Sequence, residues 1–299
     1  MRFAFLSPLL AFATLVAAHP GEHHSFVRKS DELIAHELMA RKCAGAIAEF
    51  ENQRRVAREA KHPYLARRQT PTTTAPTPHY TTIQNSTCVT AVELTEGPYY
   101  IRNEYIRYDL RENQGGVTLV LDVGVIDTTT CRPFPNAFVE LWAVNATGFY
   151  GGYSPGGNVH TDTFLRGGQF TNENGIVELT TLFPGYYTGR TSHIHAMIHK
   201  NAQRNANGTI ASGSGQVNHI GQFFFDESWN DRVFSTAPYT NTREIRMYNN
   251  QDWILWQGGA SAFVNTEPLG AALTDGLLGY ITVAVDGSKN YRIMNTNVM

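Results

Sequence analysis

The sequence is poor in charge and has no excess of either sign. Lysine and arginine number 24 against 26 aspartates and glutamates, which gives a formal net charge of −2 over 299 residues. A chain that binds nucleic acid or an anionic membrane through its overall charge carries a basic excess. The near-neutral balance therefore argues against both kinds of partner.

Long apolar runs are also scarce. The one near the N-terminus is too short to span a bilayer, and no later run of about 18 apolar residues follows it. Arg2, the apolar run and the small residues Val16 and Ala18 form the pattern of a secretory signal peptide, residues 1–18, cleaved after Ala18. We therefore expect a secreted, extracellular protein, with a buried N-terminal core helix as the alternative.

Cysteine is rare, with only Cys43, Cys88 and Cys131 in the chain. Two of them are expected to pair in an oxidising compartment. We expect a Cys88–Cys131 disulfide, and pairing of Cys43 with one of these two is the alternative. Three N-glycosylation sequons fit the same compartment and predict glycans at Asn85, Asn145 and Asn207.

Residues 19–68 differ in pattern from the rest of the chain. A cap at Ser30 and a stop at Pro63 predict a helical segment. Its approximate apolar stripe consists of Leu33, Ile34, Leu38, Ile47 and Phe50. One interpretation is a helix packed on the main domain, where the stripe could also contact a second chain in a homodimer. The other is a propeptide removed at the dibasic pair Arg67–Arg68, together with Cys43.

Residues 69–79, rich in threonine and proline, predict an extended linker. From Tyr80 to the C-terminus the pattern is one of short strands separated by Gly, Asn and Pro. Apolar residues alternate on one face of two such strands: Val117, Leu119, Leu121, Val123 and Val125 in the first, and Ala137, Val139, Leu141 and Ala143 in the second. The region 80–299 is therefore predicted to be all-β, an antiparallel β-sandwich with long functional loops.

The segment "PGYYTGRTSHIH" carries the candidate chemistry. On a strand, His193 and His195 point to the same face about 6–7 Å apart and can share a metal ion, whereas His199 lies about 13 Å along the strand. Tyr187 and Arg190 add a hard oxygen donor and a cation. Phenolate oxygen suits Fe(III) better than zinc. The segment therefore favours an oxidised, hard metal whose ligand or product is anionic.

Three longer segments resemble the intradiol ring-cleavage dioxygenases: "GVTLVLDVGVIDTTTCRPFPNAFVELWAVNATGFY", "FLRGGQFTNENGIVELTTLFPGYYTGRTSHIH" and "GQFFFD". The likeness runs from about Thr87 to Asp286 and is closest to the secreted, single-chain branch of the family. It implies a non-haem Fe(III) held by two tyrosines and two histidines. By motif position these are Tyr150, Tyr187, His193 and His195, with Tyr153 as the competitor for the first place.

The same resemblance implies the roles of the neighbouring residues. Arg190 and Gln222 are expected on the substrate side of the iron, with Tyr187 as the ligand that leaves and accepts a proton. Arg190 would stabilise charge on the ring, with a surface ion pair as the alternative, and Gln222 would hold an oxygen species by hydrogen bonding, with a strand cap as the alternative. The expected pocket wall consists of Gly97, Pro98, Tyr99 and Trp142.

The implied reaction is intradiol cleavage of a catechol-type aromatic with O2, which inserts both oxygen atoms and gives a muconate-type diacid. Two other interpretations stay open at this point. "HIHAMIH" superficially resembles the metal motif of a cupin oxidase, although His199 stands where that motif has glutamate. A transthyretin-like binding module would also account for the strand pattern and needs neither tyrosine.

Overall fold

The computed structural model describes residues 34, 38, 41–68, 93–154 and 157–298. The expected signal peptide, the linker 69–79, Asn85 and Cys88 lie outside these residues, so the predictions made for them stay predictions. No helix in the described ranges is long and apolar enough to cross a membrane.

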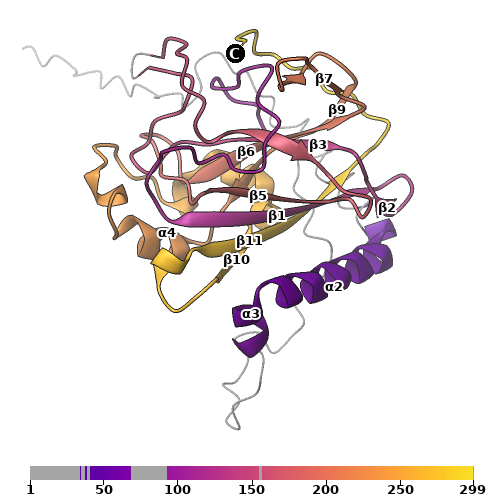
Figure 1. Ribbon diagram of the computed structural model, residues 1–299, viewed down its shortest axis with the longest axis horizontal. Helices are drawn as coiled ribbons and strands as arrows, with labels where there is room; N and C mark the ends of the chain where they lie inside the picture. The colour runs from indigo at the N-terminus through magenta and orange to yellow at the C-terminus, as the bar shows by residue number, and fades with distance from the viewer. Residues whose placement is uncertain (1–33, 35–37, 39–40, 69–92, 155–156, 299) are drawn as a thin grey trace, which may run out of the picture.

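Two β-sheets face each other across one apolar core (Figure 1). The first sheet has the order β10-β11-β1-β2, with β5 also paired to β1, and the second has the order β4-β3-β6-β9. The strands of the first are β1 (Thr118–Asp127), β2 (Arg132–Pro133), β5 (Ile176–Leu182), β10 (Asn265–Pro268) and β11 (Leu277–Val285). Those of the second are β3 (Phe138–Trp142), β4 (Arg166–Phe170), β6 (His193–Lys200) and β9 (Gln216–Phe224). The predicted sandwich is confirmed, although β1 and β11 pair in parallel.

Smaller elements connect these sheets. A short hairpin consists of β7 (Gln203–Arg204) and β8 (Ile210–Ala211). Helices α4 (Glu227–Phe234) and α5 (Trp253–Gly258) follow β9. Single 3-10 turns span Tyr239–Asn241, Asn249–Gln251, Gly259–Ala262 and Leu273–Asp275. The long β9–β10 connection thus carries both helices.

The alternating residues of the strands fill the core as their period predicts. Leu121 and Val123 of β1 share this core with Val139 of β3 and Ile194 of β6, and all four are buried. Alternation then places the other side chains of β3 and β6 on the outer face of the second sheet. That face carries Glu140, Trp142, His193, His195 and His199, all buried beneath the loops that cover it. The polar residues of the second sheet are therefore gathered on one side.

Helices α2 (Ala44–Lys61) and α3 (Pro63–Arg68) follow each other, and α2 lies on the outer face of the first sheet (Figure 1). Phe50 is buried there, and the buried Arg54 donates to Asp122 at 2.7 Å and to Thr282 at 2.6 Å. The packed-helix interpretation matches this arrangement. The N-terminal part of the predicted apolar stripe is not buried, because Ile34 and Leu38 are more than half exposed. Cleavage at Arg67–Arg68 and dimerisation stay predictions.

The disulfide joins Cys43 to Cys131, so the Cys88–Cys131 pairing is wrong. Cys43 stands directly before α2, and Cys131 lies in the turn that follows β1; their Cα atoms are 5.1 Å apart. Docking of α2 against the end of β1 brings the two cysteines together across 88 residues of sequence. A cut at Arg67–Arg68 would consequently leave the helix attached to the sandwich through this bond.

Removal of the disulfide in the variant Cys43→Ala/Cys131→Ala is expected to lower the free energy of unfolding by about 2–4 kcal/mol, because the bond closes a long loop in the unfolded chain. Denaturant unfolding of the variant and the parent measures this difference. Cys88→Ala is the matched control and should cost far less. An equal loss in the control would contradict the assigned pairing.

Candidate functional site

The centre of the site lies on the outer face of β6. His193 and His195 are two residues apart on this strand, and their Nε2 atoms lie 3.2 Å from each other. The Oη atom of Tyr150, from the loop after β3, lies 3.4 Å from His193 Nε2. All three side chains are buried. The predicted same-face pair of histidines is thus confirmed, with a phenol oxygen beside it.

Tyr187 reaches the same place from the loop between β5 and β6. Its ring centroid lies 5.7 Å from that of His193 and 5.8 Å from that of Tyr150. Its hydroxyl is buried and donates to no described residue, whereas Arg190 acts on it as a hydrogen-bond donor. A buried phenol oxygen without a protein acceptor is costly unless something else occupies its lone pairs. The structure therefore brings the four expected ligands together.

Tyr153, the competitor for the position of Tyr150, points elsewhere. Its Oη lies 3.3 Å from the carbonyl oxygen of Pro98 and 3.1 Å from that of Tyr100, and it accepts a hydrogen bond from Asn297 Nδ2 at 2.8 Å. Its hydroxyl is thus held by the backbone at the start of the domain. Tyr150, not Tyr153, is the tyrosine that faces the histidines.

The four side chains fit a hard metal ion. His193 Nδ1 lies 2.7 Å from the carbonyl oxygen of Thr191, so this nitrogen carries the proton and leaves the Nε2 lone pair facing the site. The ring of His195 stacks on Trp142 at 4.9 Å and 6°, which fixes its plane. Two phenol oxygens and two imidazole nitrogens suit ferric iron. Among the described residues no three His, Cys, Asp or Glu form a metal group, as expected for a set in which only the two histidines belong to these types.

The protein alone keeps both phenols protonated. Burial raises the pKa of Tyr150 well above its usual value and that of Tyr187 to about 12. Arg190 opposes this effect at both phenols because its positive charge favours the phenolate. A bound cation would be needed to ionise them near neutral pH.

Arg190 belongs to a buried hydrogen-bonded chain and is not a surface ion pair. Its Nε donates to Asp252 Oδ2 at 2.7 Å, and both side chains are completely buried. Its Nη2 donates to Gln222 Oε1 at 2.6 Å, and Gln222 Nε2 donates to the carbonyl oxygen of Thr95 at 3.0 Å. Gln222 stands opposite His195 in β9 and does not cap the strand. Its amide therefore holds Arg190 in place beside the expected ligands.

The expected wall residue Tyr99 lies against both tyrosines. Its ring stacks on Tyr150 at a centroid distance of 4.6 Å and meets Tyr187 edge-on at 6.0 Å. Gly97 and Pro98 form the half-buried turn that leads into it. Trp142 is completely buried behind His195. Tyr99 is thus the wall residue whose ring contacts both tyrosines.

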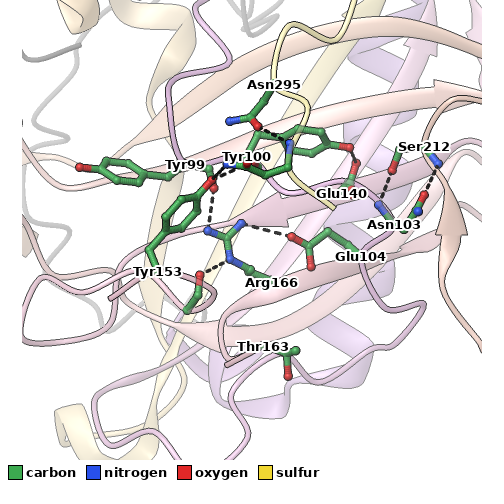
Figure 2. Close-up of polar contacts among 12 residues, drawn as sticks. Tyr99, Tyr100, Asn103, Glu104, Glu140, Tyr153, Thr163, Arg166, Ser212 and Asn295 are labelled. Atoms are coloured by element: carbon green, nitrogen blue, oxygen red, sulfur yellow. Dashed lines mark hydrogen bonds and ion pairs between the residues drawn. The ribbon is translucent and has the colours of Figure 1, made fainter. Parts of the chain in front are cut away.

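Arg166, which the sequence does not single out, connects this wall to a ligand loop (Figure 2). Its Nη2 donates to the carbonyl oxygen of Tyr99 at 2.6 Å, and its Nε donates to the carbonyl oxygen of Gly151, the residue after Tyr150. Its Nη1 donates to Glu104 at 3.2 Å, and both charged side chains are completely buried. Arg166 therefore fixes the backbone on both sides of the stacked pair.

Glu140, which the sequence also does not single out, lies near Arg166 and Glu104 (Figure 2). Glu140 of β3 accepts from the Tyr100 hydroxyl at 3.0 Å and lies 2.7 Å from His199 Nε2. His199 is thus bound to a carboxylate and does not join the other two histidines, as its distance along the strand predicts. Burial raises the pKa of Glu104 to about 8, against the opposing charge of Arg166, and Glu140 adds to the rise. None of these partners has a recognisable spacing in the sequence.

Two of the predicted glycosylation sites lie in described loops. Asn145 donates to Gln114 and accepts from Thr147, so its side chain is part of the loop before Tyr150. Asn207 is exposed and accepts from Thr209 of its own sequon. Glycans at both positions stay predictions.

Comparison with known proteins agrees with this site. The family model described as "Dioxygenase" matches residues 95–251, which contain all four converging side chains. An intradiol ring-cleavage dioxygenase from Tetranychus urticae is 34% identical and has a TM-score of 0.59, over 69% of this chain and 98% of its own. A catechol 1,2-dioxygenase from Acinetobacter baylyi is 35% identical over 97 residues, which span 31% of this chain and only 30% of that protein.

The β-sandwich and the match to the family model define this protein as a dioxygenase, which is a class of oxidoreductase. The chain belongs to the intradiol ring-cleavage dioxygenase family.

Proposed function

We propose that this protein binds one Fe(III) through Tyr150, Tyr187, His193 and His195 and cleaves a catechol with O2 between its two hydroxyl-bearing carbons. One observation carries the proposal, namely that three donor atoms lie together. The Nε2 atoms of His193 and His195 are 3.2 Å apart, Tyr150 Oη is 3.4 Å from His193 Nε2, and the buried Tyr187 lies beside them. The product is a muconate-type diacid. One catechol and one O2 supply all its atoms, so no external reductant is needed.

Bound ferric iron would supply the positive charge that ionises the phenols and would activate the ring of a bound catechol toward O2. Tyr187 is the candidate proton acceptor for a catechol hydroxyl, because its oxygen is buried and donates to no described residue. Arg190, held by Asp252 and Gln222, presents a fixed positive charge to a ring that becomes electron-rich. Tyr99 offers an aromatic ring beside both tyrosines.

The visible spectrum and the iron content of the purified protein test this proposal first. We expect about one iron per chain and a broad tyrosinate-to-iron charge-transfer band, with ring opening of catechol and matching O2 uptake. Tyr187→Phe should lose much of the band and lower the rate of ring opening about 100-fold or more, because it removes both a ligand and a proton acceptor. Tyr150→Phe should also change the band.

Tyr153→Phe is the matched control, since this tyrosine is adjacent in the fold but bonds to the backbone. It should retain the band. A protein that stays colourless after loading with iron would contradict the ferric-tyrosinate site and would favour the cupin-like or binding-module alternatives. Loss of the band in Tyr153→Phe alone would transfer the ligand assignment to that residue.

We also propose that the protein is secreted and extracellular. The leader-like residues 1–18 motivate the proposal, and the Cys43–Cys131 bond supports it because such bonds persist in oxidising compartments. N-terminal sequencing of protein collected from the medium of a eukaryotic host should begin after Ala18. Protein retained in the cells with Met1 intact would argue against this localisation.

A further inference from the structure

A short segment of the β9–β10 connection, residues 242–246, binds to the loop that carries Tyr187. Glu244 Oε2 accepts hydrogen bonds from the Thr188 N–H at 2.8 Å and from the Thr188 hydroxyl at 2.6 Å. The Thr188 hydroxyl in turn accepts from the Ile245 N–H at 3.0 Å. Because Thr188 directly follows Tyr187, three hydrogen bonds hold the residue next to this tyrosine.

The same segment also binds to the loop that carries Tyr150. Thr242 Oγ1 donates to the carbonyl oxygen of Thr147, three residues before Tyr150, at 3.0 Å. It also accepts from the Glu244 N–H at 3.2 Å. The residue that binds one tyrosine loop is therefore hydrogen-bonded to the residue that binds the other.

The two loops meet each other at Gly148. Its φ of +93° lies in the left-handed region that favours glycine. A Cβ atom placed on Gly148 would come within 2.5 Å of the Tyr186 carbonyl oxygen and within 2.8 Å of Glu244 Cγ. The backbone before Tyr150 thus lies against the backbone before Tyr187, and Glu244 packs at the same point.

The segment is itself attached to the rest of the fold on both sides. Three residues before it, the buried Tyr239 donates to the carbonyl oxygen of Phe183 at 2.7 Å, and Phe183 follows β5 at the start of the Tyr187 loop. At its end, Arg246 donates to Glu227 and, at 2.6 Å, to Asp231, both in α4. The segment therefore has its own supports, which do not depend on the two loops that it joins.

We propose that residues 242–246 form a clamp that positions Tyr150 and Tyr187 relative to each other, with Thr242 and Glu244 as its positioning residues. The inference deepens the proposed function and rests on it, because it takes these two tyrosines as ligands of one ferric ion. Such a site needs its ligands held within about 0.5 Å of the productive geometry. Both positioning residues act through the loops and take no part in the bond changes.

Hydrogen exchange in the iron-free protein tests the clamp independently of the reaction. Thr242→Val removes the bond to the Tyr150 loop and should speed amide exchange about tenfold in the segment 147–151. Thr188→Val removes the hydroxyl from the other loop and should do the same in the segment 186–190. Glu244→Ala should speed exchange in both segments.

The iron-loaded protein tests the consequence for the site. Glu244→Ala and Thr188→Val should each displace the charge-transfer band and lower kcat for catechol about fivefold, with a smaller change in KM, because misplaced ligands raise the barrier more than they weaken binding. The double variant should lose no more than the worse single variant, because both changes remove the same contact. Thr188→Ser keeps the hydroxyl and should restore the band and kcat.

Glu173→Ala is the matched control for Glu244→Ala, because Glu173 is exposed in the turn between β4 and β5. It should leave exchange in both loops, the band and kcat unchanged. Parent-like exchange in both loops of Glu244→Ala, or additive losses in the double variant, would overturn the inference. If the iron-loaded parent shows no band and opens no catechol, the proposed function fails, whereas exchange in the two loops still decides whether the clamp holds them.

Discussion

Asp252→Ala is expected to destabilise the folded protein by about 3–5 kcal/mol, because it leaves the buried Arg190 without its counter-charge. Asp252 Oδ2 also accepts from the Thr191 N–H at 3.0 Å. Its Oδ1 accepts from the N–H groups of Ile254 and Leu255 and so caps α5. One completely buried carboxylate thus orients Arg190, the backbone just before β6 and the start of α5.

The effect should reach the reaction as well as the fold. If Arg190 stabilises charge that develops on the ring, Asp252→Asn should lower kcat for ring opening by more than it raises KM, because the lost interaction belongs to the transition state. Denaturant unfolding and steady-state kinetics on the iron-loaded protein measure the two effects separately.

Asp226→Ala is the matched control for Asp252→Ala. Asp226 is also the residue before a helix, α4, but it is exposed and its side chain makes no capping hydrogen bond. Its replacement should cost less than about 0.5 kcal/mol. A similarly small loss in Asp252→Ala would contradict the buried ion pair.

The sequence predicts the sandwich well because alternation along a strand is local information. Leu121 and Val123 alternate with residues of the other face of β1, and the structure places both in the core. The same rule places His193 and His195 on one face of β6, and the distance along the strand separates His199 from them. Burial of one face fixes the register of each strand, so the pattern survives into the fold.

The two tyrosines proposed as ligands could be found only with a motif longer than the period of a strand. Tyr150 and Tyr187 come from two loops, and nothing local distinguishes Tyr150 from Tyr153. The distinction becomes visible only when Tyr153 meets the carbonyl oxygens of Pro98 and Tyr100, which lie 55 and 53 residues away in the chain. Loop tyrosines are positioned by such distant partners, so the spacing in the sequence supports the assignment without determining it.

The supporting carboxylates could not be predicted. Asp252 is 62 residues from Arg190, and Glu104 is 62 residues from Arg166. The disulfide prediction was wrong for the same reason, since Cys43 reaches Cys131 only after α2 packs on the first sheet. Pairings of this kind depend on tertiary packing, and no periodic pattern in one sequence encodes them.

Arg166→Leu is the second variant with a large expected effect, a loss of about 3–5 kcal/mol in the free energy of unfolding, because it leaves several acceptors without their donor. It removes three hydrogen bonds, to Glu104 and to the carbonyl oxygens of Tyr99 and Gly151. Because these carbonyls flank the stacked pair of Tyr99 and Tyr150, the pair should shift. In the iron-loaded protein we expect a displaced charge-transfer band and a raised KM for catechol.

Two control variants distinguish the effect of the position of Arg166 from the effect of its charge. Arg102→Leu also removes a guanidinium that donates to two carbonyl oxygens, those of Asn295 and Ile293, but away from the ligands, so the band should stay in place. Glu104→Gln keeps an acceptor for Arg166. The pKa of Glu104, raised from 4.5 to about 8, means that the folded protein keeps a proton that the unfolded chain releases, so stability falls as the pH rises between these values. Glu104→Gln should therefore flatten the fall in stability over this range and move the band little. A band that is displaced equally in Arg102→Leu and Arg166→Leu would contradict the specific link between Arg166 and the tyrosine pair.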